Sequence, residues 1–266
     1  MHIRQITNLL PQPIRFGLRQ FVFKGTAHTC VLCGNHVREF RSHGGDAEVL
    51  DARQVVGGKR RDNDRCPVCH GSDRTRMMMM YLKDETPVCD EPLRILHAAP
   101  DSGLYLWLKR QPNVTYIGSD IDVSRYRHIE NMQTADLTNM PFENNSFDLL
   151  ICSHVLEHIP DDGAAFAEIF RVLKPGGRAL LLTPFALDGK GTDEDLGIND
   201  SAEQDRRFGQ WDHVRLYDRD DFLKRMRSAG FDASLFDTFD SDQDQAERLH
   251  LNPLELLPIG TKPLNS

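Results

Sequence analysis

From residue 93 onward, short apolar runs alternate with segments whose apolar residues recur at helical spacing. The apolar runs lie at 93–99, 115–118, 132–135, 147–153 and 178–183. A helix is expected at 164–173, because Lys174-Pro175-Gly176-Gly177 would end it. Such alternation predicts a parallel sheet covered by helices on both faces.

The last part of the chain predicts two more strands, which would complete a seven-stranded sheet. A helix is expected near 220–229, followed by an antiparallel pair at 233–239 and 254–259. The second of these strands contains Pro258, which cannot donate to a ladder and therefore predicts an edge position. The pattern as a whole indicates an α/β fold with a doubly wound, mostly parallel sheet.

The part before residue 93 is organised differently. Residues 1–24 are expected to form an amphipathic helical segment that packs on the body, and 25–76 a small cysteine-containing module. Residues 77–92 would form a connecting helix and linker, and 93–266 the α/β domain. The run MMMMYL within the connecting helix predicts adaptable core packing.

Four of the six cysteines form two pairs with a two-residue gap, Cys30 with Cys33 and Cys66 with Cys69. Thiolates at this spacing can reach one ion, and two such pairs make a closed tetrahedral set that suits Zn²⁺. A site with four thiolates leaves no open position for a substrate. The pattern therefore predicts structural zinc.

Composition and charge restrict where such a protein works. With 39% apolar and 27% charged residues, the chain is typical of globular proteins. No apolar run approaches the ~20 residues of a membrane span, and the N-terminus lacks the apolar core of a secretory signal, so we expect a cytoplasmic protein. The net charge of −8 is uneven: residues 1–92 have 14 Lys/Arg and 11 Asp/Glu, about +3, so the remainder carries about −11. The acidic main domain argues against extensive contact with nucleic acid.

Polar residues follow the ends of the predicted strands. Asp120 ends the second strand, Asp136 follows the third, and Ser153 ends the fourth. An acid at the end of the second strand can accept hydrogen bonds from both hydroxyls of a ribose. Because ligands bind at the carboxyl ends of such sheets, the turn at 98–103 and these three residues predict one site along that edge.

Two longer blocks, ADLTNMPFENNSFDLLICSHVLEHIPDD and AEIFRVLKPGGRALLLTPF, carry a resemblance to a known family. Over about 93–240 the chain resembles class I S-adenosylmethionine-dependent methyltransferases, in particular the bacterial type 11 group. The resemblance implies a Rossmann-like fold with S-adenosylmethionine as cofactor. It implies that Asp120 holds the ribose, that Asp136 and Leu137 flank the adenine, and that the first loop supports the methionine end. The implied cofactor-binding residues are His97, Ala98, Ala99, Asp101, Gly103, Asp120, Ile121, Asp136, Leu137 and Ser153.

The first loop departs from the family pattern, which has an acid followed by three spaced glycines. Here His97 replaces the acid, Ala99 and Asp101 replace two glycines, and Gly103 remains. The chain resembles a subgroup with a histidine and an Ala-Pro-acid turn in this loop, paired cysteine knuckles and a downstream FGQ-x-DHVR-x-Y, present here at 208–217. We therefore expect the loop to bind the cofactor through a different turn.

Candidate residues for the chemistry lie in two places. Methyl transfer requires alignment of the reacting atoms, and a base is needed only if the acceptor must lose a proton. His154 and His158 lie at the mouth of the fourth strand. His154 is expected to touch cofactor or substrate, whereas Glu157 and His158 are expected to pack near the cofactor or cap the next helix. After the fifth strand, His213 is a candidate base and Arg215 a candidate clamp for an anionic acceptor group. Alternatively, Arg215 pairs with Asp212 and closes a lid.

That lid would be the polar stretch 188–210, which could also be a mobile surface loop. The favoured function is transfer of a methyl group to an oxygen or nitrogen of a small molecule or sugar-like metabolite. A second hypothesis is an RNA or protein methyltransferase in which the zinc module and the basic cluster at 53–76 dock the polymer. That cluster could instead hold a phosphate or carboxylate of a substrate, or form a solvated face with internal ion pairs. A third is a non-catalytic cofactor-binding scaffold. The sequence indicates no oligomeric state.

Overall fold

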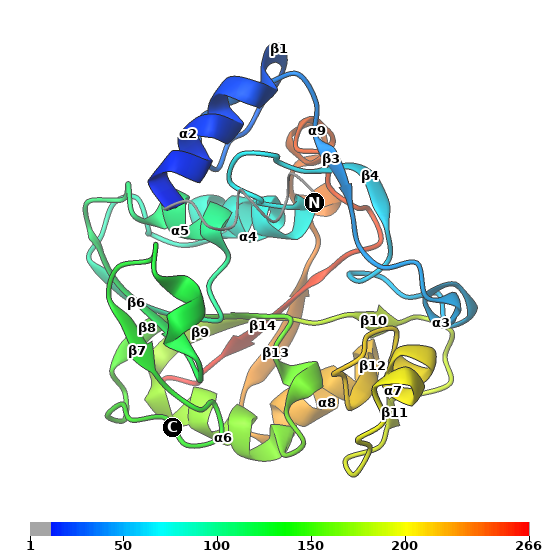
Figure 1. Ribbon diagram of the computed structural model, residues 1–266. Helices are drawn as coiled ribbons and strands as arrows, with labels where there is room; N and C mark the ends of the chain where they lie inside the picture. Colours follow the sequence, from blue (N-terminus) through cyan, green and yellow to red (C-terminus); the bar gives the residue numbers. More distant parts are fainter. Residues whose placement is uncertain (1–11, 266) are drawn as a thin grey trace.

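The computed structural model describes residues 12–265 and has a seven-stranded sheet at its centre (Figure 1). The strand order is β13-β14-β9-β8-β5-β6-β7. The strands are β5 (Leu93–Ala98), β6 (Val114–Asp120), β7 (Met132–Thr134), β8 (Phe147–Ser153), β9 (Leu173–Leu182), β13 (Asp232–Phe236) and β14 (Leu257–Thr261). β5 to β9 are parallel, and β14 runs antiparallel to both of its neighbours. The predicted mostly parallel, doubly wound sheet is confirmed.

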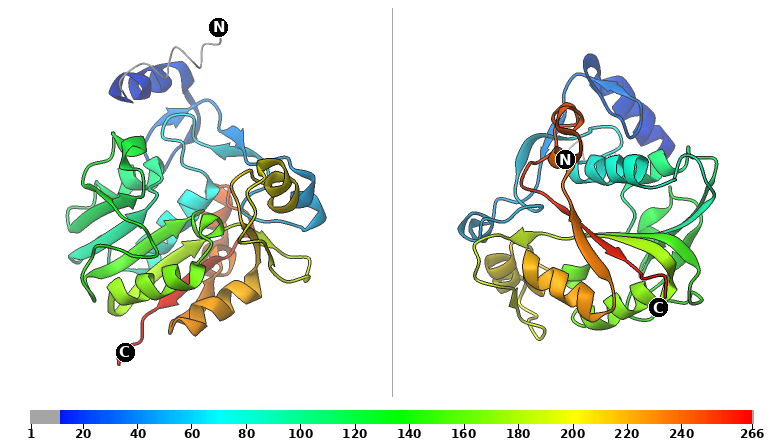
Figure 2. Two further views of the ribbon diagram at one scale, coloured as in Figure 1. Left: turned by 60° about the horizontal axis from the view of Figure 1, so that its bottom comes forward. Right: turned by 180° about the vertical axis from the view of Figure 1, so that it is seen from behind.

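Helices cover both faces of this sheet (Figures 1 and 2). α4 (Asp73–Glu85) and α5 (Ser102–Leu108) lie on one face, and α6 (Asp162–Val172) and α8 (Arg219–Ser228) on the other. The central strands are therefore buried on both sides, which is why β5 and β8 have continuous apolar runs. β6 and β7 lie on one side of β5, whereas β8 and β9 lie on its other side. The strand order therefore reverses between β5 and β8.

The predicted C-terminal strand pair is present, with one correction. β13 and β14 pair antiparallel, but β14 lies between β13 and β9, so the expectation of an edge position for Pro258 was wrong. Pro258 is opposite Leu235 on β13, whereas pairing with β9 begins only at Ile259. Pro258 therefore precedes the residues of β14 that pair with β9, so its lack of an N–H removes no hydrogen bond to β9.

The N-terminal part forms two small hairpins and a helix beside the sheet domain. α2 (Gln12–Phe23) covers the described part of the predicted N-terminal segment, while residues 1–11 lie outside the described residues. β1 (Lys24–Thr29) pairs with β2 (His36–Val37), and β3 (Arg41–His43) with β4 (Arg61–Arg65). The short helix α3 (Glu48–Ala52) lies between the two strands of the second hairpin.

The interior of this module continues into the core of the sheet domain. Leu32 and Val68 belong to the same buried cluster as the methionines of α4 and the central strands. Met77 to Met80 are all at most 6% exposed, which confirms that they pack in the core. Among residues 12–265, no helix has both the length and the apolar character needed to cross a bilayer.

The stretch 188–210, expected as a lid, is folded. β10 (Phe185–Ala186), β12 (Arg215–Asp218) and β11 (Asp193–Glu194) form a second, three-stranded sheet. α7 (Ser201–Phe208) follows β11, and its Phe208 is buried against Leu50 of α3. This subdomain connects the N-terminal module to the carboxyl edge of the main sheet.

Candidate active site and metal centre

A cavity of about 840 Å³ opens at the carboxyl ends of the central parallel strands. Its walls come from the ends of β5, β6 and β8, from the turn after β7 and from the turn at 153–161. Gln210 and Asp212 approach it from the loop before β12. This is the crevice where the strand order reverses, and ligands of open α/β sheets bind in such a crevice.

The turn after β5 reaches the cavity without the usual glycines. Ala99 has a left-handed φ of 45°, and its N–H donates to the carbonyl of Ser119 at 2.8 Å. Asp101 then caps α5 by accepting hydrogen bonds from the N–H groups of Gly103 and Leu104, at 2.7 and 3.2 Å. The left-handed residue costs alanine about 1 kcal/mol, and the cap stabilises the helix that follows. Together they make a sharp strand-to-helix turn.

Most of the expected cofactor residues line this cavity. They are Ala98, Ala99, Asp120, Ile121, Asp136, Leu137 and Ser153.

Three expected cofactor residues, His97, Asp101 and Gly103, do not line the cavity, which corrects their assignment as contacts. His97 is 1% exposed and its Nδ1 lies 3.2 Å from the hydroxyl of Tyr116. Burial lowers the pKa of His97 to about 3, so the ring is neutral. Gly103 packs on the cysteine module, since a Cβ built there would lie 2.8 Å from the Cα of Gly71. The glycine retained in the loop therefore serves packing of the module.

Asp120 ends β6 with its carboxylate at the cavity wall. Its Oδ1 accepts from the N–H of Asp122 at 2.8 Å, and its Oδ2 accepts from the hydroxyl of Tyr126 at 2.9 Å. Tyr126 belongs to the short helix η1 (Val123–Tyr126), which also borders the cavity. Each carboxylate oxygen has a further lone pair, so both can still accept a hydrogen bond from a ligand.

Apolar and polar groups flank Asp120 on either side. Ile121 is 71% exposed at the rim, while Leu137 is 6% exposed behind it. Asp136 is held by the N–H and the hydroxyl of Thr138, both at 2.8 Å from its Oδ1. Ser119 also lines the cavity, and its buried Oγ has no hydrogen-bond partner. A ligand with an apolar ring and several hydroxyl groups fits this set.

A buried cluster of ionisable groups follows β8. His154 has a left-handed φ of 57° and lines the cavity. Its Nδ1 lies 3.2 Å from Oε1 of Glu157 and its Nε2 lies 2.7 Å from Nη1 of Arg74. Burial and the Arg74 guanidinium lower the pKa of His154 to about 4, although Glu157 opposes this effect. The ring is therefore neutral near pH 7.

Glu157 lies at the centre of this cluster, within η2 (Leu156–His158). Burial alone would raise its pKa, but the hydrogen bond with His154 and the nearby imidazoles lower the pKa to about 2. Its Oε2 accepts from the hydroxyl of Thr183 at 2.9 Å, and its Oε1 lies 3.9 Å from Nε2 of His213. Glu157 therefore orients two histidines as an ionised carboxylate. The expectation that it only packs or caps was incomplete.

His213 itself is 4% exposed and does not line the cavity. Its ring packs edge-on against that of His158, with 4.7 Å between the centroids. Burial lowers the pKa of His213. His213 therefore lies behind the cavity wall, beside Glu157 and His158, and in this structure it does not reach the cavity as the predicted base would have to.

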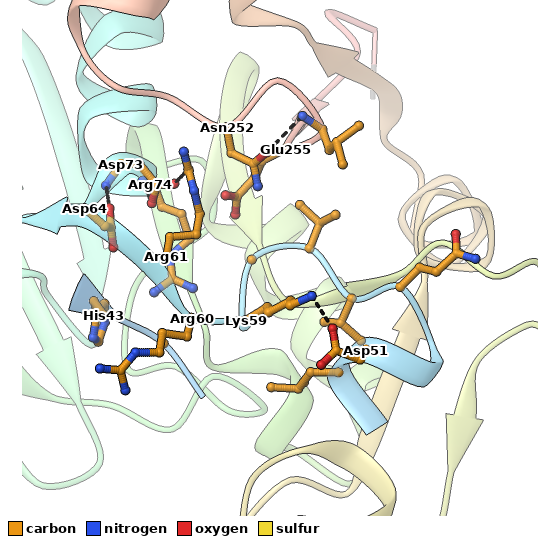
Figure 3. Close-up of a pocket in the computed structure, with 17 residues that line it drawn as sticks. His43, Asp51, Lys59, Arg60, Arg61, Asp64, Asp73, Arg74, Asn252 and Glu255 are labelled. Carbon is orange, nitrogen blue, oxygen red and sulfur yellow. Dashed lines mark hydrogen bonds and ion pairs between the residues drawn. The ribbon is translucent and has the colours of Figure 1, made fainter. Parts of the chain in front are cut away.

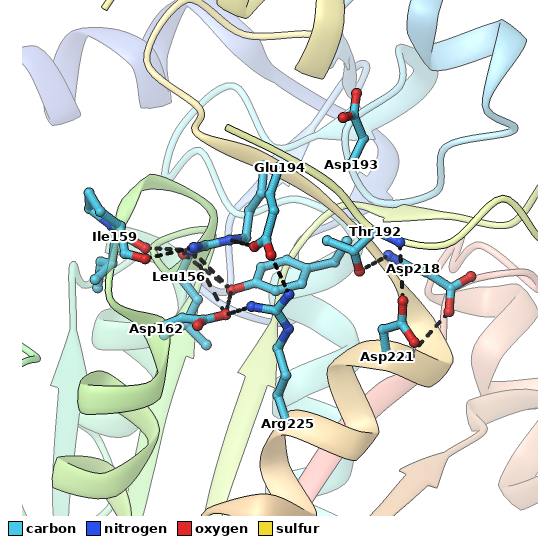
Figure 4. A network of polar contacts seen from close by, with 12 residues as sticks. Leu156, Ile159, Asp162, Thr192, Asp193, Glu194, Asp218, Asp221 and Arg225 are labelled. Atoms are coloured by element: carbon cyan, nitrogen blue, oxygen red, sulfur yellow. Dashed lines mark hydrogen bonds and ion pairs between the residues drawn. The ribbon is translucent and has the colours of Figure 1, made fainter. Parts of the chain in front are cut away.

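Arg215 is also placed differently from the expectation. Its side chain is 0% exposed, and it donates to the carbonyls of Leu156 at 3.1 Å and Pro160 at 2.8 Å. Its Nε lies 3.2 Å from Oε2 of Glu194. Figure 4 shows Glu194 and Arg225 facing each other in this network, where they make an ion pair of 3.0 Å. Arg215 therefore fixes the 156–160 turn, and burial excludes it from clamping an acceptor or pairing with Asp212.

Several residues at or next to the cavity wall had only a weak signal in the sequence. Arg74 comes from α4 and meets His154 across 80 positions of the chain. Tyr126 and Ser119 are close to Asp120 in sequence, but nothing in their spacing marks them as wall residues. His158 contacts the carbonyl of Asp212 through its Nδ1 at 3.2 Å. Of these residues, Ser119 was the one that the strand alternation could have identified.

The four paired cysteines form a second site. The Sγ atoms of Cys30 and Cys69 are 3.7 Å apart, and those of Cys33 and Cys66 are 3.9 Å apart. A tetrahedral thiolate site with metal–sulfur bonds of about 2.3 Å has sulfurs about 3.8 Å apart. The side-chain amide of Asn35 and the N–H of Gly71 point at two of the sulfurs, at 3.2 and 3.5 Å. This donor set fits one closed tetrahedral metal ion.

Comparisons with known proteins agree with this geometry. Residues 103–181 match the family model described as "Methyltransferase domain". The ubiquinone/menaquinone biosynthesis C-methyltransferase UbiE of Brucella canis is 39% identical over 83 residues, which are 27% of this chain and 31% of that protein. The demethylmenaquinone methyltransferase of Staphylococcus epidermidis is 33% identical over 95 residues, 35% of this chain and 38% of that protein. The chain spans about a third of the length of the curated relatives it matches.

Solved structures were also compared with the chain. The YcgJ protein of Bacillus subtilis is similar with a TM-score of 0.47 and 19% identity, over 71% of this chain and 98% of that one. Phosphoethanolamine N-methyltransferase 2 of Haemonchus contortus, in complex with S-adenosyl-L-methionine, gives a TM-score of 0.48 and 14% identity, over 73% of this chain and 53% of that one. The family match and the similarity to curated methyltransferases show that the chain contains a methyltransferase domain, built on a seven-stranded, mostly parallel Rossmann-like sheet.

Proposed function

We propose that the protein transfers a methyl group from S-adenosylmethionine to an oxygen or nitrogen atom of a small-molecule acceptor. The main support for this proposal is the position of Asp120 at the end of β6. Its carboxylate lies at the cavity wall, and each of its oxygens can accept one more hydrogen bond. A ribose with two free hydroxyls is the ligand that such a carboxylate selects.

The residues that line the cavity support one arrangement of the cofactor. Asp120 would hold the ribose hydroxyls, Ile121 and Leu137 would flank the adenine, and the turn at Ala98 and Ala99 would support the methionine end. When bound, S-adenosylmethionine supplies a methyl carbon that an acceptor's lone pair attacks while the carbon–sulfur electron pair stays on sulfur. Neutral His154, on the same wall, is the group placed to take the acceptor's proton.

We further propose that the four cysteines hold one structural Zn²⁺. Cys30, Cys66 and Cys69 are at most 2% exposed, so a metal ion there would have no open position for a substrate. The site packs against Gly103 at the start of α5 through Gly71 and Leu32. A bound ion would thereby stabilise the turn that borders the cofactor cavity.

The proposed function is tested by transfer of a labelled methyl group to an acceptor. The protein is incubated with S-adenosylmethionine labelled on the methyl carbon and with cell extract separated into small molecules, RNA and protein. Label in a small molecule supports the proposal, and the labelled product shows whether oxygen, nitrogen or carbon was methylated. Cofactor binding with no labelled fraction would favour the non-catalytic scaffold. Asp120→Ala serves as the control at low cofactor concentration, since it should bind the cofactor much more weakly than the unaltered chain.

RNA remains the second candidate acceptor because of one surface feature. A basic groove beside the cysteine module is lined by Arg15, Arg19, Arg41 and Arg65. Phosphate contacts to such a groove would make RNA binding fall steeply with salt. RNA affinity that is weak and insensitive to salt would exclude this candidate. Most of the basic cluster at 53–76 is less available, because Arg53, for example, pairs with Asp188 at 2.7 Å.

A further inference from the structure

Figure 3 shows a second cavity, of about 370 Å³. Arg74 on its wall contacts His154, which lines the cofactor cavity. It is enclosed by the second hairpin of the module with α3, by the start of α4 and by the loop at 252–255. A Cβ on Gly57 of this wall would lie 3.4 Å from the carbonyl oxygen of Thr183, just after β9. The second cavity therefore opens over the same carboxyl edge of the sheet.

Four positively charged side chains lie on its wall. Lys59, Arg60, Arg61 and Arg74 face it. Figure 3 shows these side chains arranged around one space. The first three are matched by carboxylates, in ion pairs with Asp51, Asp46 and Asp73 respectively.

Arg74 differs from its neighbours. Among the described residues, no carboxylate lies within ion-pair distance of its guanidinium, whose recorded side-chain contact is Nε2 of His154 at 2.7 Å. A guanidinium can only donate hydrogen bonds, so Nε2 of His154 must accept, and its Nδ1 must carry the proton that faces Glu157. The lone pair that would make His154 a base is thus occupied by Arg74.

Glu255 adds a buried donor to the same wall. It is 5% exposed and its Oε1 has no hydrogen-bond partner. Burial, together with the charge of Asp73, raises the pKa of Glu255 to about 8, so it is protonated near pH 7. A protonated carboxyl donates a hydrogen bond to an oxyanion instead of repelling it. With Glu255 neutral, the carboxylates near the four cations are those of Asp51, Asp64 and Asp73 on the cavity wall and that of Asp46, which pairs with Arg60.

We propose that this second cavity binds the oxyanion of the methyl acceptor, a phosphate or a carboxylate. Arg74 moves away from His154 and donates its hydrogen bonds to this oxyanion. Identifying the bound anion as part of the methyl acceptor rests on the proposed function. Once Arg74 turns to the anion, Nε2 of His154 is free to take the proton from the acceptor's hydroxyl or amine. Glu157 then stabilises the imidazolium through the Nδ1 proton. The base is available only when a substrate with the right charge is present.

The test follows the titration of His154 by NMR in the protein without cofactor. The charged and titratable groups that act on this ring include Arg74 from α4, Glu157 from its own turn, His213 from the loop before β12 and His43 of β3. The His154 signal is assigned by its loss in His154→Gln. In buffer we expect a midpoint near pH 4, and with saturating inorganic phosphate an upward shift of about one pH unit or more. Acetate in place of phosphate shows whether a carboxylate suffices.

Variants separate the proposed role of Arg74 from general binding of anions. Arg74→Met should raise the midpoint without phosphate and abolish the response to phosphate. Arg74→Lys, which keeps the charge, is the second variant in case the first does not fold. Arg206→Met, at an exposed residue of α7 that pairs with Glu203, should respond like the unaltered protein.

An unchanged His154 midpoint with both phosphate and acetate would overturn the inference. So would an Arg74 variant that responds like the unaltered protein. A protein that passes these tests but never transfers a methyl group would refute the proposed function and leave the anion site in place, so the two failures are distinguishable.

Discussion

The carboxylate of Asp120 gives the sharpest test of the cofactor site. Replacing Asp120 with alanine removes both oxygens that can accept hydrogen bonds from a ribose. A hydrogen bond to a charged group contributes about 1.5–3 kcal/mol, and the lower end applies because Asp120 is half-buried. Two such bonds amount to about 3 kcal/mol, which corresponds to a dissociation constant about 100-fold higher.

The assay is calorimetric titration with S-adenosylmethionine, and the neighbouring acid supplies a matched control. Asp122→Ala removes a carboxylate that caps Ser124 at 3.1 Å and does not line the cavity. It should change the dissociation constant by less than about twofold, since surface changes away from a site have small effects. Thermal denaturation of each variant checks that it is folded. Equal affinity of Asp120→Ala and the unaltered chain, or no binding by the unaltered chain, would refute the assignment.

Three further predictions concern the metal, the buried arginine and the buried acid. The purified protein should contain one zinc ion per chain, and Cys66→Ser should lose the metal and lower the melting temperature; a metal-free protein with an unchanged melting temperature would contradict this. Arg215→Met should lower the free energy of unfolding by about 3 kcal/mol or more, because buried partners are left unmatched; urea denaturation measures this, and a neutral effect would count against the positioning role. Glu255 has a pKa of about 8 in the folded state against 4.5 as its ordinary value, so the folded state binds the extra proton between these values. Its contribution therefore makes stability fall as pH rises through that window. Glu255→Gln should remove this fall when melting temperatures at pH 5 and pH 9 are compared, and identical pH dependence in both proteins would show the prediction to be wrong.

Local patterns in the sequence were sufficient to predict the central strands, the paired cysteines and the position of Asp120. The central strands could be predicted because burial on both faces demands continuous apolar runs, which are visible without any partner. The cysteine pairs and Asp120 could be predicted because their chemistry depends on spacing and on position at a strand end. Ligands at the carboxyl ends of parallel strands follow from the topology of such sheets.

Only the tertiary structure decided what the polar residues do. Arg215 and His213 sit in a motif typical of a site, yet packing buries both, and Arg215 donates to carbonyls 55 to 59 positions away in the chain. Gly103 was expected to serve the cofactor but serves contact with Gly71. The pairing of Arg74 with His154 joins the cysteine module to the sheet domain. Spacing along the chain reports neighbours within one turn or strand, whereas burial and hydrogen-bond partners depend on segments that meet only when the chain folds.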